Sequence, residues 1–377
     1  MRPATPALCC LVLVLVLAPS GGAQILVDHT TVDDARIPQT YLDPVRTLDI
    51  FFVHASVGMG MVAGLKSLST ASPSRYALTL GGLGTPATWF DTNNGLVENG
   101  DWAGLGGNGN PLGKIKGFDE LIRNHGYGAR ADIAFMKFCY IDFMSSTNVA
   151  QVWAAYRDTL TALEAAYPKV TFVWLTAALN ALGTEGKVRA DFNQCVRDHC
   201  RTHGKPLFDL AAIESHDPDG NLARDDHGNE TIYAGYTDDN GHLAAAGRDR
   251  VARALWWLFA RIAGWTVAPT ALRATAGTPV LAADGAAATE IVVRLHDGTN
   301  AFDVSGPDST VTFSLTGPGS LAGSNPVATA GGVARITFRA GTSIGKARIT
   351  AAAPGLATGQ AEVDLISNRA PDAPANL

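Results

Sequence analysis

The sequence predicts an α/β domain with a parallel sheet, followed by an all-β domain. From about residue 45 to 264, short apolar runs alternate with helical stretches, which is typical of parallel strands joined by crossover helices. From Trp265 onward the apolar residues recur with a period of two, and Gly, Pro, Asn and Asp separate the runs. A chain of 377 residues also favours two domains over one.

The first 23 residues have the pattern of a secretory signal peptide. Arg2 gives a positive start, residues 7–18 form an apolar core, and small residues lead to Ala23, after which we expect cleavage. The apolar core is too short to span a bilayer comfortably. No later stretch reads as a transmembrane helix, so we expect a secreted protein, extracellular or periplasmic, without a membrane span.

Residues 24–264 are predicted to form the α/β domain. Strands are expected at residues 48–54, 76–81, 131–138, 170–175 and 206–210. Helices are expected at residues 57–68, 149–167, 187–203 and 244–263, with another starting within 118–124. Residues 82–113 are rich in Gly and Asn and are expected to form a loop. This alternation predicts a three-layer α/β/α arrangement around a flavodoxin-like parallel sheet.

Residues 265–367 are predicted to form a small β-sandwich. Its strands are expected at residues 289–295, 309–315, 332–339, 346–351 and 360–366. Residues 368–377 are rich in Pro and Ala, which is typical of a linker or tail.

Charge and cysteine content limit the function further. The net charge of -6 and the lack of a Lys/Arg cluster argue against a nucleic-acid partner. Three cysteines follow the predicted signal peptide, so at least one is unpaired within the chain. Cys195 and Cys200 point apart on a predicted helix, whereas a bridge from Cys139 to either of them remains open.

Polar residues with catalytic chemistry lie at two ends of the α/β domain. Ser56 follows the first predicted strand, and its N–H would point toward an anion formed there. A serine needs a base to act as a nucleophile, and His242 precedes the last helix. Asp239, with Asp238 as the fallback, could orient His242 by accepting its Nδ1 proton. Ser56 could instead be a plain helix N-cap, but both elements fall at the carboxyl edge of one predicted sheet.

These segments resemble the SGNH (GDSL-like) hydrolase superfamily over roughly residues 45 to 264. The match consists of residues 50–56, Asp239-x-x-His242 with Leu243 and Gly247, and a middle set at 131–142, 170–175, Asn193 and 207–210. The resemblance implies a three-layer α/β/α fold. It also implies hydrolysis of acyl esters by Ser56, His242 and Asp239, with no metal and no cofactor.

The chain departs from the family pattern in two places. The Gly-Asp-Ser-Leu signature is absent, because His54 and Ala55 precede Ser56. The third block of the family places an oxyanion-binding Asn where this chain has Ile141. Losing such a donor costs about 100- to 1000-fold in rate, so we expect a substitute.

Several residues are candidates for binding the oxyanion or the substrate. The N–H of Ser56 and a loop N–H at Gly107 or Asn108 could bind the oxyanion. Lys137 could do so as well, or could pair with Asp142. His54 and Asp142 are candidate substrate contacts, although a structural hydrogen bond is an alternative for His54. Three aromatic side chains could stack on sugar rings or pack the loop onto the body: Trp89, Phe90 and Trp102.

The second domain resembles bacterial immunoglobulin-like modules at residues 280–285 and 312–319, and also sandwich domains of large glycoside hydrolases. This resemblance favours an acylated carbohydrate, or a small ester, as the partner, although the module could be a spacer. The sequence thus predicts a secreted serine esterase, with acetyl the expected acyl group. Two alternatives remain: a non-catalytic carbohydrate-binding or adhesion protein on a hydrolase scaffold, and a lipase-like esterase. The oligomeric state is left open.

Overall fold

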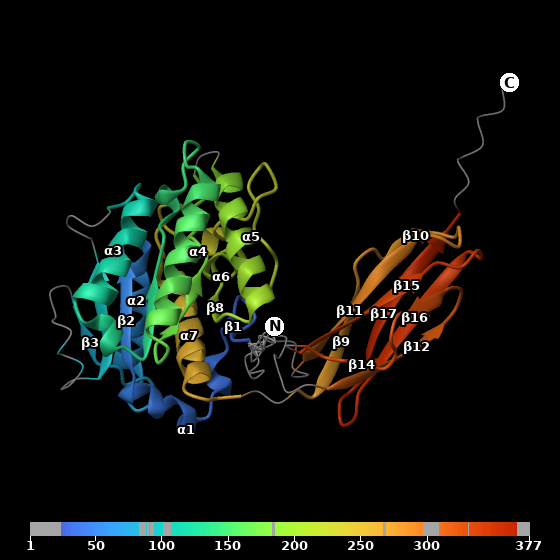
Figure 1. The fold of residues 1–377 in the computed structure, drawn as a ribbon, viewed down its shortest axis with the longest axis horizontal. Helices are drawn as coiled ribbons and strands as arrows, with labels where there is room; N and C mark the ends of the chain where they lie inside the picture. Colours follow the sequence, from blue (N-terminus) through green and yellow to red (C-terminus); the bar gives the residue numbers. More distant parts are fainter. Residues whose placement is uncertain are drawn as a thin grey trace, which may run out of the picture.

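The structure is a computed structural model, and it describes residues 24–82, 88, 90, 94–100, 107–182, 185–266, 269–296, 309–330 and 332–367. The predicted signal peptide and the predicted tail lie outside these residues. Figure 1 shows a body of helices around a sheet, followed by a second body made of strands.

The first body is built on parallel strands. They are β1 (Leu26–Val27), β2 (Asp49–His54), β3 (Leu80–Gly81), β4 (Gly95–Gly100), β5 (Ile133–Met136), β6 (Thr171–Phe172), β7 (Trp174–Leu175) and β8 (Leu207–Phe208). Hydrogen bonding gives the orders β3-β4-β2-β5-β6 and β7-β8-β1, and every pair is parallel. Only Val173 separates β6 from β7, and its N–H donates to the carbonyl of Ala134 at 3.1 Å. The two groups of strands therefore continue into one sheet.

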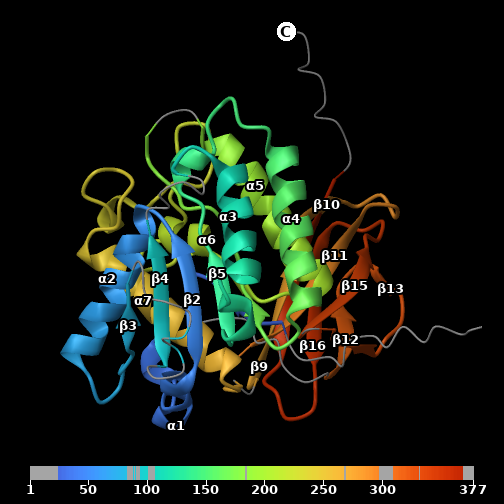
Figure 2. The same ribbon diagram turned by 60° about the vertical axis from the view of Figure 1, so that its left-hand side comes forward.

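Helices cover both faces of this sheet. The α-helices are α1 (Gln39–Leu42), α2 (Val57–Ala71), α3 (Pro111–Asn124), α4 (Val149–Ala166), α5 (Gly186–His203), α6 (Leu210–Ser215) and α7 (Ala245–Ile262). The 3-10 helices are η1 (Asp34–Arg36), η2 (Pro44–Thr47), η4 (Tyr127–Ala129), η5 (Tyr140–Asp142) and η6 (Ala234–Tyr236). Helix α2 packs on α7, whereas α3, α4 and α5 lie side by side on the other face (Figure 2).

Strand β2 lies in the middle of the sheet because all its central side chains can be buried. Ile50 and Phe52 belong to the core on the α2 and α7 side, and Phe51 and Val53 belong to the core beneath α3 and α4. Successive side chains of a strand point to opposite faces, so an unbroken apolar run suits a strand covered on both faces. The α/β/α layering predicted from the sequence is confirmed.

Two strands of the sheet were not predicted, β1 and β4. The expected loop of residues 82–113 is wrong in part, because β4 lies within it and pairs with both β2 and β3. Helix α3 also begins earlier than expected, at Pro111. Strand β4 has the sequence GLVENG, so only Leu96 and Val97 provide an apolar signal, and its pairing depends on the neighbouring β2.

The second body has two sheets, with strand orders β13-β15-β11-β9 and β10-β17-β16-β12-β14. The strands are β9 (Ala271–Ala276), β10 (Val280–Ala282), β11 (Ala288–His296), β12 (Thr310–Thr316), β13 (Ser320–Ala322), β14 (Val327–Ala328), β15 (Val333–Arg339), β16 (Gly345–Ala352) and β17 (Gly359–Ile366). Buried and exposed residues alternate along β17, as expected for a strand with one face on the core. Among the described residues, no helix is both long and apolar enough to cross a bilayer.

Candidate active site

Ser56 lies in the tight turn between β2 and α2. Its backbone has φ 52° and ψ −106°, a region that residues other than glycine rarely adopt. Such a conformation costs on the order of 1–3 kcal/mol and is found where the surrounding structure enforces it. The Ser56 side chain makes no capping hydrogen bond to α2. The structure therefore does not support the N-cap interpretation of Ser56.

Small residues allow the close packing that brings the two ends of the site together. A Cβ on Gly58 would lie 2.3 Å from the Cβ of His54, so the turn after Ser56 has no room for a side chain. A Cβ on Gly64 would lie 2.3 Å from the carbonyl oxygen of Arg248 on α7. Because α2 and α7 approach so closely, the start of α2 and the loop before α7 are neighbours.

The loop before α7 positions His242 beside Ser56. The Oγ of Ser56 is 2.6 Å from Nε2 of His242, and Nδ1 of His242 is 2.6 Å from Oδ2 of Asp239. The other carboxylate oxygen of Asp239 accepts the backbone N–H groups of His242 at 2.7 Å and of Gly241 at 3.0 Å. The structure thus brings the three predicted residues into one hydrogen-bonded chain, and it selects Asp239 over Asp238.

The Asp239 side chain is 55% exposed, so burial has little effect on its charge. Hydrogen bonds are what keep the carboxylate ionised. The backbone N–H of His242, followed by its imidazole, lowers the pKa of Asp239 to about 2. The carboxylate therefore remains charged at neutral pH and can stabilise an imidazolium on His242.

Tyr140 is a neighbour of His242 that the sequence did not reveal. The two rings meet edge to face, with centroids 6.1 Å apart. A Cβ on Gly241 would lie 2.8 Å from the Tyr140 ring, so the turn that carries His242 packs directly on this tyrosine. The position of Tyr140 beside Ile141, in the stretch similar to the third family block, was the only signal available.

The loop of residues 107–110 is exposed but tied to the body by a buried ion pair. Nζ of Lys114 donates to Oδ2 of Asp142 at 2.6 Å and to Oδ1 of Asn108 at 2.8 Å. The other oxygen of Asp142 accepts the N–H of Gly109 at 2.8 Å. Asp142 is buried and occupied by these donors, so its prediction as a substrate contact is wrong. Gly107 and Asn108 are exposed, and their role in binding an oxyanion stays a prediction.

Lys137 does not have either of the roles predicted for it. Its Nζ is buried and has no hydrogen-bond partner within the described part of the chain, so it cannot contact a bound substrate. It forms no ion pair with Asp142, which pairs with Lys114 from α3 instead. Burial lowers the pKa of Lys137. Burial also raises the pKa of the nearby Glu214 to about 8, although the Lys137 charge acts in the opposite direction.

His54 is buried rather than available to a substrate. Its Nε2 lies 2.7 Å from Oε2 of Glu98 on the neighbouring strand β4. The substrate-contact prediction for His54 is therefore wrong, and the geometry agrees with the structural alternative. Trp89 and Trp102 lie outside the described residues, whereas Phe90 is buried in the core and agrees with the packing alternative.

The three cysteines that follow the predicted signal peptide do not pair with one another. Cys139, Cys195 and Cys200 are all unpaired. Within the described ranges, no group of three or more His, Cys, Asp or Glu side chains is arranged to hold a metal ion.

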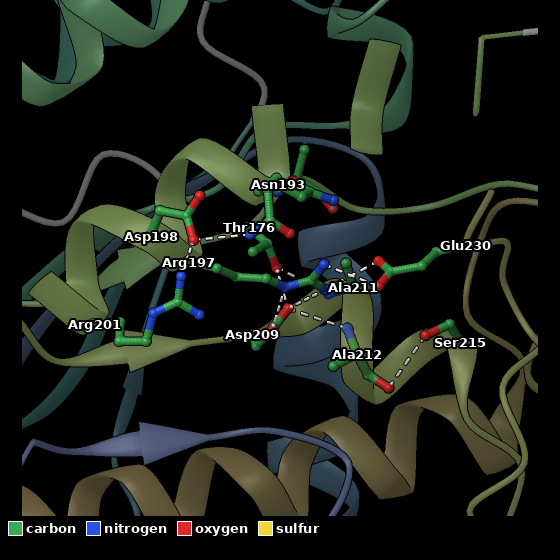
Figure 3. Close-up of polar contacts among 12 residues, drawn as sticks. Thr176, Asn193, Arg197, Asp198, Arg201, Asp209, Ala211, Ala212, Ser215 and Glu230 are labelled. Carbon is green, nitrogen blue, oxygen red and sulfur yellow. Dashed lines mark hydrogen bonds and ion pairs between the residues drawn. The ribbon is translucent and has the colours of Figure 1, made fainter. Parts of the chain in front are cut away.

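A second set of charges, centred on Arg197, joins several segments near the ends of β7 and β8 (Figure 3). The guanidinium donates to both oxygens of Asp209 at 2.6 and 2.9 Å, and to both oxygens of Glu230 at 2.9 and 3.0 Å. Asp209 also accepts the hydroxyl of Thr176 at 3.0 Å and caps α6 through the N–H of Ala212. This network links the end of β7, helix α5 and the start of α6.

No protein-family model and no curated protein matches the chain. Solved structures similar to the α/β domain include one described as a platelet activating factor from Streptococcus pneumonia. It is 15% identical, covers 59% of this chain and 91% of its own, and has a TM-score of 0.35. A structure described as a lipolytic protein of the G-D-S-L family from Desulfitobacterium hafniense is 6% identical, with 55% and 98% coverage and a TM-score of 0.35.

Other solved structures are similar to the C-terminal domain. The adhesin InvE of Yersinia pseudotuberculosis is 28% identical over 26% of each chain, with a TM-score of 0.21. A β-glucuronidase from glycoside hydrolase family 2 is 21% identical over 28% of this chain and 12% of its own, with a TM-score of 0.26. The chain thus spans about a quarter or less of these two proteins. Because all these TM-scores are below 0.5, the fold assignment rests on the strand order of the chain itself.

Proposed function

We propose that this protein is a serine esterase of the SGNH (GDSL-like) type. The observation that carries the proposal is the continuous chain from Ser56 Oγ through the His242 imidazole to the Asp239 carboxylate, with both links at 2.6 Å. A hydroxyl, an imidazole and a carboxylate in this order form the constellation that activates a serine for acyl transfer.

In the proposed mechanism, Oγ of Ser56 attacks the ester carbonyl while Nε2 of His242 takes its proton. Asp239 holds the ring and stabilises the imidazolium. The tetrahedral oxyanion accepts the N–H of Ser56 and an N–H near Gly107 or Asn108. Within the described residues the Ser56 N–H donates to no other acceptor, which favours this role. Collapse expels the alcohol, which takes the proton from His242, and water then releases the acyl group by the same steps.

We further propose that the protein is secreted and acts on an acylated carbohydrate, with acetyl the expected acyl group. The apolar N-terminal segment supports secretion. The immunoglobulin-like character of the second domain supports a polymeric substrate or a cell-surface setting. No chemistry of the described site requires a metal or a cofactor.

A lipase-like esterase is a second candidate, and exposed apolar side chains favour it. Met59 in the first turn of α2 is 56% exposed, and Ile141 and Met144 after β5 are 40% and 41% exposed. All three follow the carboxyl ends of β2 or β5, the edge that carries Ser56. Such side chains could contact a long acyl group. A non-catalytic role on a hydrolase scaffold is the third candidate, since Ile141 replaces the family's oxyanion-binding Asn.

Labelling with a fluorophosphonate tests whether Ser56 is a nucleophile. We expect labelling of the wild type and of the control Ser67→Ala, which lies on α2, and no labelling of Ser56→Ala. Acetate release from acetylated polysaccharides should show the same pattern. Equal labelling of Ser56→Ala would refute the proposal. A panel of soluble esters with lengthening acyl chains separates the candidates, because a lipase-like enzyme would prefer the longer chains.

A further inference from the structure

We propose that Lys114 and Asp142 are positioning residues that set the oxyanion-binding loop, residues 107–110, relative to Ser56. This inference rests on the proposed esterase function and goes beyond it, because neither residue touches the substrate.

Within the described part of the chain, few other contacts hold the loop in a fixed position. It has the sequence Gly107-Asn108-Gly109-Asn110, all four residues are exposed, and none contributes an apolar side chain to the core. Its internal bonds are short-range: the N–H of Asn110 donates to Gly107, and the Asn110 side chain caps α3 through Gly113. Such a segment adopts many conformations unless it is anchored from outside.

The buried ion pair supplies that anchor. Lys114 is 1% exposed and Asp142 is fully buried, so their 2.6 Å contact is shielded from water. Lys114 reaches the side chain of Asn108, and Asp142 accepts the N–H of Gly109. Two successive residues of the loop are therefore fixed by the two members of one pair.

The same pair is connected to the proposed catalytic residues. Oδ2 of Asp142 also accepts the N–H of Cys139 at 2.7 Å, which fixes the turn after β5. Tyr140 in that turn packs against His242. The N–H of Lys137 donates to the carbonyl of Val53 on β2, three residues before Ser56. The loop and the nucleophile are thus tied to one turn.

The cost of burying these charges supports a positioning role. Removing a lysine and a carboxylate from water is unfavourable, and an apolar pair of similar size would often stabilise a fold as well or better. An apolar pair could not accept the N–H of Gly109 or bind Asn108. What the ion pair adds, compared with apolar packing, is the geometry of the loop.

The test compares Lys114→Met with the neutral double variant Lys114→Met/Asp142→Asn. The single variant leaves Asp142 buried and unpaired, so we expect a lower melting temperature and a kcat about 10- to 100-fold lower, with KM changed by less than about threefold. The double variant removes the unpaired charge. We expect it to regain most of the melting temperature but not kcat, because Asn108 has still lost its anchor.

The control is Arg197→Lys, which weakens a partly buried ion-pair network on α5, makes no contact with the loop, and should lower the melting temperature without lowering kcat. Hydrogen exchange of residues 107–110 should become faster in both Lys114 variants and not in the control. Recovery of kcat together with melting temperature in the double variant would overturn the inference, as would unchanged exchange in the loop. Absence of fluorophosphonate labelling in the wild type would instead refute the esterase proposal itself.

Discussion

Asp239 and Asp209 are two carboxylates of the α/β domain, each beside a basic side chain. Residues near in the sequence fix the first, and residues from distant elements fix the second. Asp239 is exposed and is fixed by N–H groups of its own four-residue turn. Asp209 is buried and is fixed by Arg197 and Thr176, which come from other elements. A local turn thus sets the geometry beside His242, whereas long-range contacts hold Asp209 between the end of β7 and helix α5. We therefore expect substitutions at Asp239 to change the rate and substitutions at Asp209 to change stability.

The largest expected effect is on the rate of Asp239→Asn. An amide at this position would favour the wrong tautomer of His242, and kcat should fall by about 10⁴-fold. The melting temperature should stay close to that of the wild type, because the side chain is exposed. Steady-state kinetics with an acetyl ester and a thermal melt measure the two quantities. A rate loss below tenfold would separate Asp239 from the catalytic chain.

Asp209→Ala should show the opposite pattern. It leaves Arg197, whose side chain is 19% exposed, bound to Glu230 alone and removes the acceptor of the Thr176 hydroxyl, so the free energy of unfolding should fall by about 1–3 kcal/mol. The activity per folded molecule should be retained. Urea unfolding measures the loss, and Asp198→Ala is the matched control, because that exposed ion pair should contribute less than about 1 kcal/mol. Equal losses at Asp209 and Asp198 would contradict the distinction.

Gly58→Ala should affect both the rate and the stability, because Gly58 packs on His54 directly after the turn that carries Ser56. The added methyl would overlap His54, and relieving that overlap should cost about 1–3 kcal/mol and shift Ser56. We expect a lower melting temperature and a lower kcat together. Gly82→Ala, where a Cβ would have open space, should change neither.

The smallest effect expected is on pH dependence. The folded-state pKa of Asp239, about 2, is below the value of about 3.9 usual for an unfolded chain. The contribution of ionised Asp239 to the free energy of unfolding is therefore present above pH 4 and is lost as the pH falls through 2. An NMR titration of the Asp239 carboxyl should give a midpoint near 2. A midpoint near 4 would mean that the turn does not hold the carboxylate in solution.

Site residues held by neighbours in the sequence could be predicted, whereas those held by distant segments could not. Ser56 and the Asp239-x-x-His242 motif could be found because a strand end and a short turn leave local patterns. Lys114 could not, because its partner Asp142 comes from a different element. Proximity in sequence favoured a pairing of Lys137 with Asp142, but the topology brings α3 to that carboxylate.

Strands of the sheet could likewise be predicted only where the local sequence carries a clear apolar pattern. Strand β2 was evident because four consecutive apolar residues, 50–53, fill both cores. Strand β4 has two apolar residues between glycines and polar residues, so only its neighbours make it a strand. In the sandwich the five long strands alternate clearly and were predicted, whereas β9, β10, β13 and β14 were missed.

The backbone strain at Ser56 has a practical consequence. Glycine accepts positive φ without the steric cost that serine bears there. Replacing the nucleophile with glycine would therefore relax the turn while removing the attacking oxygen. Under the proposed esterase function, this variant would be inactive and more stable than the wild type, so it could retain an intact ester from a mixture for identification by mass spectrometry.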